Sequence, residues 1–350
     1  MPEDNIINIG IIGCGGLPQG VLLPCVAAIP ELNLIATCDL DEARAEMVAR
    51  RYGAGIWTTD WRELLEMDEL DGVMVVAPPA VHEEVGIAVL ERGLHLFIEK
   101  PPSMTVEGAR RVFETSRGRN LKTLVGTVQR HTPVCRMAKE ITQRDDFGRT
   151  LLYQARYCAP GPGMRMDWGM DRDSEDEMLH FFLLDHIIHH IDLTRFFMGE
   201  IIAVSTYRTE GIPDRYAFAA SLKFESGASG SLSCSFKAPS FDNQVVIYGD
   251  GPVAVEVKNW STLEYRAENL PVGKGGYQDS PKVKWDGGIS YQDGVMRPGY
   301  RSELSLWVNG ILQGARCHAD VEDAWRDMVV LETLLESLRV EEPRRVEYRQ

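Results

Sequence analysis

The chain has 350 residues, enough for two domains with a core each, and its 44% hydrophobic and 25% charged residues are typical of a globular protein. Its 52 acidic and 37 basic residues give a net charge of −15, which disfavours binding to nucleic-acid phosphates and anionic lipid. No apolar run reaches the roughly 20 residues of a membrane span and the seven cysteines are scattered, so we expect a cytoplasmic protein without membrane or nucleic-acid partners.

The first 128 residues alternate short apolar strands with helices. Strands are expected at 6–12, 33–38, 72–77, 95–99 and 123–126, and helices at 41–53, 80–92 and 106–117. Nearly continuous apolar strands in this alternation predict a buried, doubly wound parallel sheet of the Rossmann type over residues 1–128. Such sheets bind ligands at the carboxyl ends of their strands.

A glycine-rich turn follows the first strand and contains Gly13, Gly15, Gly16 and Leu17. Glycine is needed there because a Cβ would block both the tight turn and the approach of a pyrophosphate to the helix N-terminus. Pro18 replaces the third small residue of the strict G-x-G-x-x-G pattern. The turn alone therefore also fits a glycine-rich loop that binds nothing.

Asp39 ends the second strand and strengthens the dinucleotide interpretation. A carboxylate at this position accepts hydrogen bonds from the ribose hydroxyls and repels a 2′-phosphate, which favours NAD over NADP. The alternative for Asp39 is a plain turn residue before a helix.

The chain changes character after the first domain. A helix at 133–143 and a strand at 149–158 precede an irregular segment, 159–179, that is too long for a plain connector and suggests an active-site loop. Alternating apolar and polar runs then predict antiparallel strands, and a final helix follows at 321–339. We expect residues 129–350 to form an α+β substrate-binding and oligomerisation domain on an open, largely antiparallel sheet. Covering that sheet favours a homodimer or homotetramer.

Residues 183–193 read LLDHIIHHIDL. At about 100° per residue, Asp185 and His189 share one helix face, whereas His186 and His190 form a second pair rotated by about 100°. A carboxylate beside an imidazole raises its basicity and fixes its orientation, so the first pair suits proton transfer.

Two other interpretations of this helix stay open. Two histidines four residues apart also suit zinc, but no H-E-x-x-H or C-x-x-C motif supplies further ligands, so we expect no metal. The helix could also carry histidines with purely structural partners. Proton transfer is favoured by Lys100, which ends the fifth strand where a nicotinamide would lie.

Together these segments resemble the Gfo/Idh/MocA family (glucose–fructose oxidoreductase, inositol dehydrogenase, rhizopine catabolism) over nearly the whole chain. IGIIGCGG is similar to the family's nucleotide turn, and VVAPPAVHEEVGIAVLERGLHLFIEKP to its fourth and fifth strands with the E-K-P signature. VGTVQRHTP is similar to its crossover, and LLDHIIHHIDLTRFFMG to its D-x-x-x-H-x-x-D helix.

The resemblance implies catalytic roles for Lys100, Asp185 and His189. The cofactor would be lined by Gly13, Gly15, Gly16, Leu17, Asp39, Ala77, Pro78, His82, Glu99, Lys100 and Arg130. Candidates for substrate contact are Trp168, His186 and His190. Bulky residues in LHFFLLD replace the family's usual glycines before the helix aspartate, so the substrate itself is not implied.

The expected activity is NAD-dependent hydride transfer between nicotinamide and a sugar, polyol, inositol or related cyclic alcohol. His189 would accept the hydroxyl proton, and Lys100 would stabilise charge on the reacting oxygen. One alternative is a glycoside hydrolase or lyase that retains NAD and oxidises its substrate transiently; net NADH production distinguishes the two. Another is a non-catalytic NAD sensor, which would have no need of a proton acceptor.

Overall fold

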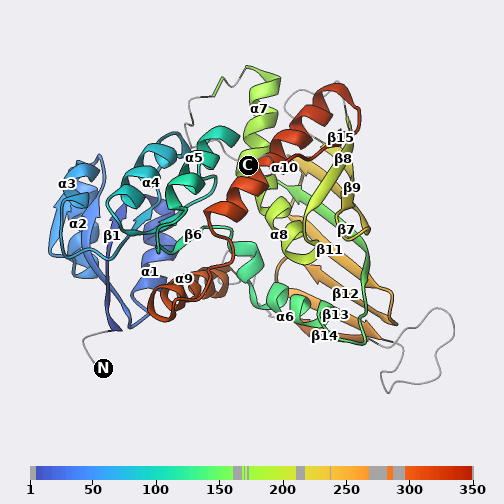
Figure 1. Cartoon of the computed structure of the whole chain (residues 1–350), viewed down its shortest axis with the longest axis horizontal. Coiled ribbons are helices and arrows are strands. Elements are labelled where there is room, and N and C mark those ends of the chain that lie inside the picture. The colour runs from blue at the N-terminus through green and yellow to red at the C-terminus, as the bar shows by residue number, and fades with distance from the viewer. Residues whose placement is uncertain are drawn as a thin grey trace. The chain divides into compact units, whose positions relative to one another are not determined.

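The computed structural model of the chain describes residues 5–160, 168, 170–171, 173–209, 217–236, 238–267, 282–286 and 296–348. The chain divides into two compact units (Figure 1). The first unit comprises residues 1–128, 166–169 and 297–328, and the second comprises 129–165, 170–296 and 329–350. No helix in the described segments is both long enough and apolar enough to cross a membrane.

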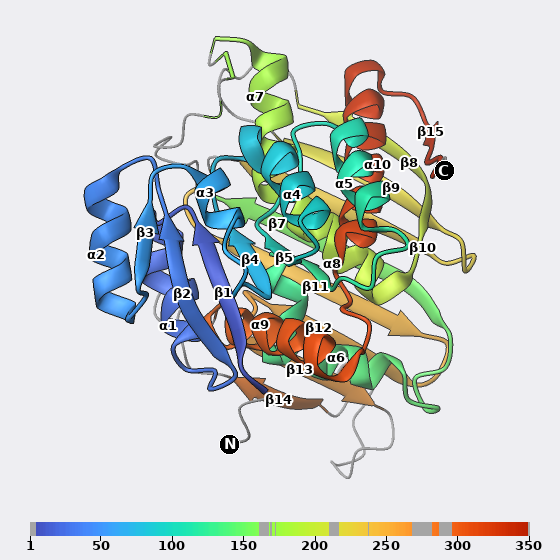
Figure 2. The ribbon, with the colours of Figure 1, turned by 60° about the vertical axis from the view of Figure 1, so that its left-hand side comes forward.

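The first unit is built on a six-stranded parallel sheet in the order β3-β2-β1-β4-β5-β6. Its strands are β1 (Ile7–Ile12), β2 (Leu32–Cys38), β3 (Ile56–Thr58), β4 (Gly72–Val75), β5 (His95–Ile98) and β6 (Thr123–Val125). Figure 2 shows β3, β2, β1 and β4 side by side. The order reverses between β1 and β4, where sheets of this kind bind ligands beyond the strand ends. The expected doubly wound sheet is confirmed.

The connecting helices of the first unit are η2 (Pro18–Leu22), α1 (Leu23–Val26), α2 (Glu42–Tyr52), α3 (Trp61–Leu65), η3 (Pro79–Val81), α4 (His82–Glu91) and α5 (Val106–Ser116). Their ends follow from local chemistry. The side chains of Asp41 and Thr105 accept backbone N–H groups at the start of α2 and α5, and Gly53 ends α2 with a φ of 80°. The short elements β3 and α3 were not predicted, because so few residues show no periodicity.

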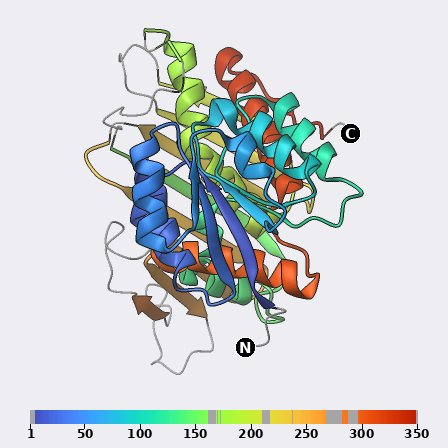
Figure 3. The same cartoon turned by 90° about the vertical axis from the view of Figure 1, so that its left-hand side faces the viewer.

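Helix α9 (Met296–Gln313) belongs to the first unit, although the sequence boundary after residue 128 had assigned it to the second. Its Trp307 is fully buried, meets Phe97 of β5 edge-on with ring centroids 6.2 Å apart, and donates its Nε1–H to the carbonyl of Lys122 at 3.2 Å. Figure 3 shows α9 in orange beside the dark-blue strands. The helix returns because its apolar side covers one face of the parallel sheet.

The second unit is built on a nine-stranded sheet in the order β14-β13-β12-β11-β7-β10-β9-β8-β15. Its strands are β7 (Thr150–Ala159), β8 (Ile201–Arg208), β9 (Ala217–Phe224), β10 (Ser229–Phe236), β11 (Asp242–Gly249), β12 (Val253–Lys258), β13 (Thr262–Ala267), β14 (Lys282–Asp286) and β15 (Arg344–Arg345). All neighbours are antiparallel except β7 and β10, so the expected largely antiparallel sheet is confirmed.

The helices of the second unit are η4 (Val128–His131), α6 (Pro133–Thr142), α7 (Glu175–Phe182), η5 (Leu183–Ile187) and α8 (Ile188–Met198), with the end of α10 (Val321–Val340). Helix α6 packs on β12, and α8 packs on β7. The predicted loop 159–179 lies partly outside the described residues, and its end forms the start of α7.

Candidate active site

The nucleotide turn in the first unit lies between the carboxyl ends of β1 and β4. Gly13 has a φ of 98°, and a Cβ there would lie 2.1 Å from the carbonyl oxygen of Val76, so no other residue fits. A Cβ at Gly15 or Gly16 would meet no protein atom within 4 Å. Packing therefore requires the first glycine, whereas the other two leave the backbone open to a pyrophosphate, and the turn fits a dinucleotide.

Asp39 fixes this turn to the end of β2. Its carboxylate accepts the backbone N–H of Cys14 at 2.8 Å and that of Asp41 at 2.9 Å. Burial and the nearby Asp39 charge raise the pKa of the Cys14 thiol to about 12, so this thiol stays protonated beside the turn.

Arg44 is a residue that the sequence analysis missed. Its guanidinium donates to both oxygens of Asp39, at 3.2 and 3.4 Å, and its side chain is 41% exposed. A basic residue in the first turn after an acidic strand end was the available signal. Arg44 offsets part of the negative charge with which Asp39 would repel a 2′-phosphate.

Three further predicted cofactor residues keep exposed surface near this edge of the sheet. Leu17 and Ala77 are half-buried and Pro78 is exposed. Leu17 immediately follows the glycine turn, and Ala77 and Pro78 lie in the segment between β4 and η3. Their exposed surface is compatible with the predicted contacts to the cofactor, and no observation in the structure tests those contacts.

Lys100 follows β5 on a turn that Glu99 organises. The Glu99 carboxylate is buried and accepts the Lys100 backbone N–H at 3.2 Å. A Cβ on Gly126 would lie 2.6 Å from that carboxylate, so a glycine after β6 is what admits the Glu99 side chain. The Lys100 Nζ lies 5.9 Å from the ring centroid of Trp168, a cation–π distance. The structure thus brings a predicted catalytic residue and a predicted substrate residue together.

His82 lies beneath this turn rather than on its surface. It is fully buried, and its Nδ1 lies 2.7 Å from the Pro101 carbonyl oxygen, to which it donates as a neutral ring. Burial lowers the pKa of His82 to about 4. Its position supports the segment that carries Lys100, and the predicted direct contact with cofactor gains no support from its burial.

The helix of the second unit sorts its side chains by burial. Within residues 181–195, only Asp185, His186 and His189 keep exposed surface. The predicted core face is confirmed, since Leu184, Ile187, Ile188 and Ile191 are all buried. The accessible side therefore presents one carboxylate and two imidazoles.

The predicted pair of His186 and His190 lies against a common neighbour, Tyr157, but the two side chains differ in burial. The predicted substrate contact of His190 is wrong. Residues 183–187 form a π-helical turn, whose added residue shifts the facing of the side chains that a regular helix would give. His186 lies beside Asp185, with Nε2 3.4 Å from Oδ2. His190 is fully buried instead, with its ring centroid 4.6 Å from that of Tyr157 and 5.3 Å from that of Trp260, which leaves no surface for a substrate.

Arg130 anchors the same helix. Its Nε donates to Oδ2 of Asp192 at 2.8 Å, its Nη2 donates to Oδ1, and both side chains are nearly inaccessible. The predicted cofactor contact of Arg130 stays a prediction, because this guanidinium is engaged inside the second unit. Among the described residues, no group of three or more His, Cys, Asp or Glu side chains could hold a metal ion.

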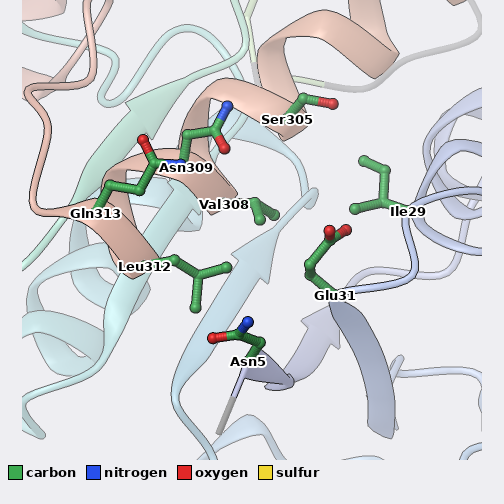
Figure 4. Close-up of a pocket in the computed structure, with 8 residues that line it drawn as sticks. All are labelled: Asn5, Ile29, Glu31, Ser305, Val308, Asn309, Leu312 and Gln313. Carbon is green, nitrogen blue, oxygen red and sulfur yellow. The ribbon is translucent and has the colours of Figure 1, made fainter. Parts of the chain in front are cut away.

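A cavity of about 480 Å³ lies at the other end of the parallel sheet, where β1 and β2 begin. Figure 4 shows its lining of Asn5, Ile29, Glu31, Ser305, Val308, Asn309, Leu312 and Gln313. It shares no residue with the predicted site.

Comparison with known proteins supports the assignment of the first unit as an NAD-binding domain. A family model described as an oxidoreductase family with an NAD-binding Rossmann fold matches residues 7–127, and the GFO/IDH/MocA C-terminal domain matches residues 135–252. A crystal structure of a dehydrogenase from Chromobacterium violaceum is similar with a TM-score of 0.86, 27% identity and 96% of each chain covered.

Two curated relatives are named as dehydrogenases of levoglucosan and of scyllo-inositol. Levoglucosan dehydrogenase of Pseudarthrobacter phenanthrenivorans is 28% identical over 60% of this chain, and the match spans only 55% of that relative. The scyllo-inositol 2-dehydrogenase (NAD(+)) of Bacillus subtilis is 26% identical over 67% of this chain and 68% of its own length.

The parallel sheet, its open glycine turn and the matched models define an NAD-binding oxidoreductase. The two family models cover more than half of the chain, and the chain belongs to the Gfo/Idh/MocA family.

We predict that Asp39 sets the preference for NAD over NADP. The wild type should bind NAD at least about tenfold more tightly than NADP. The Asp39 carboxylate can accept a hydrogen bond from the 2′-hydroxyl of NAD, and a hydrogen bond to a charged group contributes about 1.5–3 kcal/mol. Calorimetric titration of Asp39→Ala should show a smaller difference between the affinities for NAD and NADP. Thr105→Ala, which removes the helix cap of α5, should leave the ratio of affinities unchanged. Equal wild-type affinity for both cofactors contradicts the assignment.

The two buried histidines predict that stability falls in weak acid. Burial lowers the pKa of His82 to about 4 and that of His190 to about 3, from 6.5. Below pH 6.5 the unfolded chain takes up protons that the folded chain does not, so lowering the pH to 5 should cost about 2 kcal/mol per histidine. The loss of folding stability continues as the pH falls and stops only below the pKa values that the two histidines have in the folded protein.

Urea denaturation between pH 7 and 5 tests this. His190→Phe keeps an aromatic ring but cannot titrate, so it should remove the contribution of His190 to the dependence of the unfolding free energy on pH. An unchanged pH dependence in this variant contradicts the prediction.

Proposed function

We propose that the protein oxidises a CH–OH group of a sugar, polyol, inositol or related cyclic alcohol with NAD as hydride acceptor. The observation that carries the proposal is the accessible carboxylate–imidazole side of the second unit, Asp185 with His189, in an NAD-binding chain that carries Lys100 on the turn after β5. The levoglucosan and scyllo-inositol dehydrogenases named above support a polyhydroxylated ring as substrate.

Each residue has a distinct task in this proposal. His189 keeps exposed surface, so its ring can accept the hydroxyl proton. The Lys100 ammonium stabilises negative charge that develops on the same oxygen. Asp185 orients either His189 or a neighbouring substrate hydroxyl. The nicotinamide, when bound, supplies the hydride acceptor, and the glycine turn with Asp39 would hold the dinucleotide.

Trp168 contributes through Lys100 in this scheme. The ring holds the ammonium at cation–π distance and covers one side of it with apolar surface. A less hydrated ammonium interacts more strongly with a developing oxyanion, because the local dielectric is lower. This is the role that we propose for the predicted substrate contact.

An NADH-absorbance screen of the purified protein against inositols, polyols, aldoses and levoglucosan tests the activity. We expect net NADH production with at least one of them. In the same assay, His189→Ala should lower kcat by about 100-fold or more, because a positioned base is worth about 10²–10⁴ in rate, while NAD affinity stays nearly unchanged.

Lys100→Ala should act similarly, and the double variant should fall well short of the product of the two losses, because both groups act on one oxygen. Full turnover by His189→Ala contradicts the proposed site. Glycoside cleavage without net NADH would point instead to transient oxidation.

We also propose that the protein is a homodimer or homotetramer in the cytoplasm. One face of the nine-stranded sheet carries exposed apolar side chains: Leu152 of β7 is 37% exposed and lies opposite Tyr248 of β11, which is 36% exposed. Covering such a patch stabilises an assembly. Light scattering should give a mass of two or four chains, and Leu152→Glu should lower it; a monomeric wild type contradicts the proposal.

A further inference from the structure

A chain of polar contacts in the second unit, one hydrogen bond followed by one contact at ion-pair distance, leads from the sheet to the proposed catalytic carboxylate. The hydroxyl of Tyr157, on β7, lies 2.6 Å from Nδ1 of His186. The opposite nitrogen of the same ring, Nε2, lies 3.4 Å from Oδ2 of Asp185. The three side chains belong to one unit, so their distances are set inside it.

The ring of His186 is also held by packing. Its centroid lies 5.6 Å from that of Phe182, 5.4 Å from that of Phe236 and 5.9 Å from that of Tyr157. These aromatic rings come from α7, β10 and β7. An imidazole confined on three sides by rigid rings has few rotamers left, so its two nitrogens have fixed directions.

The two neighbours of the His186 ring together favour one tautomer. We assign the Tyr157 O–H as the donor and Nδ1 as the acceptor, because Nε2 then carries the proton of the neutral ring on the side next to the Asp185 carboxylate. Nε2 then carries its proton 3.4 Å from Oδ2 of Asp185, a distance at which the N–H dipole attracts the carboxylate without forming a regular hydrogen bond. Asp185 lies within the π-helical turn, where the backbone geometry alone gives a less regular side-chain direction.

We propose that Tyr157 and His186 are positioning residues that hold the Asp185 carboxylate in the orientation that hydride transfer requires. The inference rests on the proposed function, because it assumes that Asp185 acts on His189 or on the substrate. Neither positioning residue needs to touch the reacting atoms. Their loss should therefore lower kcat more than it changes the KM for NAD.

Strand β7 offers a matched pair of hydroxyl deletions. Tyr153 and Tyr157 point to the same side of the sheet, and both are buried. The Tyr153 hydroxyl lies 3.1 Å from Oγ1 of Thr194 on α8, whereas the Tyr157 hydroxyl serves His186. Tyr157→Phe and Tyr153→Phe thus remove the same group from the same strand, but only the first breaks the chain to Asp185.

The test measures kcat, KM and the urea midpoint of four variants of the full-length protein with a substrate found in the NADH screen. Tyr157→Phe should lower kcat by about tenfold, within the 10–100-fold typical of outer partners of a functional group. Tyr153→Phe should lower the urea midpoint and leave kcat unchanged. His186→Phe keeps an aromatic ring but has no N–H, and should lose at least as much kcat as Tyr157→Phe.

His186→Gln supplies the rescue. Its amide N–H groups reach the region of Nε2, so it should recover part of the kcat that His186→Phe loses. A purely packing role for His186 predicts the reverse order, because phenylalanine fills the aromatic site better than glutamine.

Wild-type kcat in both Tyr157→Phe and His186→Phe overturns the inference, as does an equal loss of kcat in Tyr153→Phe and Tyr157→Phe. If these variants keep their rate while His189→Ala is inactive, the proposed function stands and only the positioning chain fails. If His189→Ala keeps full turnover, the proposed function fails whatever the Tyr157 and His186 variants do.

Discussion

The buried ion pair between Arg130 and Asp192 is the constraint on which the site in the second unit depends. Both charges are removed from water, so each is tolerable only while the other is in place, and losing one partner of such a pair costs about 3–5 kcal/mol. The pair therefore fixes the rotation of α8 about its axis. Asp185, His186 and His189 precede Asp192 by at most two turns on the same continuous helical stretch, so their directions follow from that rotation together with the π-helical turn.

The first unit uses a carboxylate in a comparable way. Asp39 accepts two backbone N–H groups, from Cys14 in the glycine turn and from Asp41 at the start of α2. One side chain thereby links the end of β1, the end of β2 and the next helix. The same carboxylate is the one that would meet a ribose, so the geometry of the turn and the choice of cofactor are coupled. Arg44 completes this arrangement, since it balances a charge that would otherwise stand alone beside the buried thiols of Cys14 and Cys38.

The sequence predicted what depends on local chemistry. Strands of the parallel sheet, the caps of α2 and α5 and the buried face of the helix at Leu184, Ile187, Ile188 and Ile191 all follow from periodicity and capping residues. It failed where distant segments meet. The return of α9 to the first unit depends on Trp307, which packs against Phe97 and donates to the carbonyl of Lys122, and no pattern near residue 307 reveals those partners. The burial of His190 and the π-helical turn at residues 183–187 were not predicted, because neither is visible in a hydrophobic pattern.

Three histidines within five residues, 186, 189 and 190, end in three physical environments, and burial explains the division of tasks. His190 is enclosed by apolar rings, and burial lowers its pKa to about 3, so at neutral pH it stays uncharged and cannot serve as a useful proton acceptor. His186 has a tyrosine on one nitrogen and a carboxylate beside the other, so a proton transferred to it would disrupt the hydrogen bond from Tyr157. His189 keeps exposed surface, and a base must reach the proton that it accepts. Burial therefore argues against His190 as the base and existing contacts argue against His186, so the proposal that His189 is the base rests on packing as much as on chemistry.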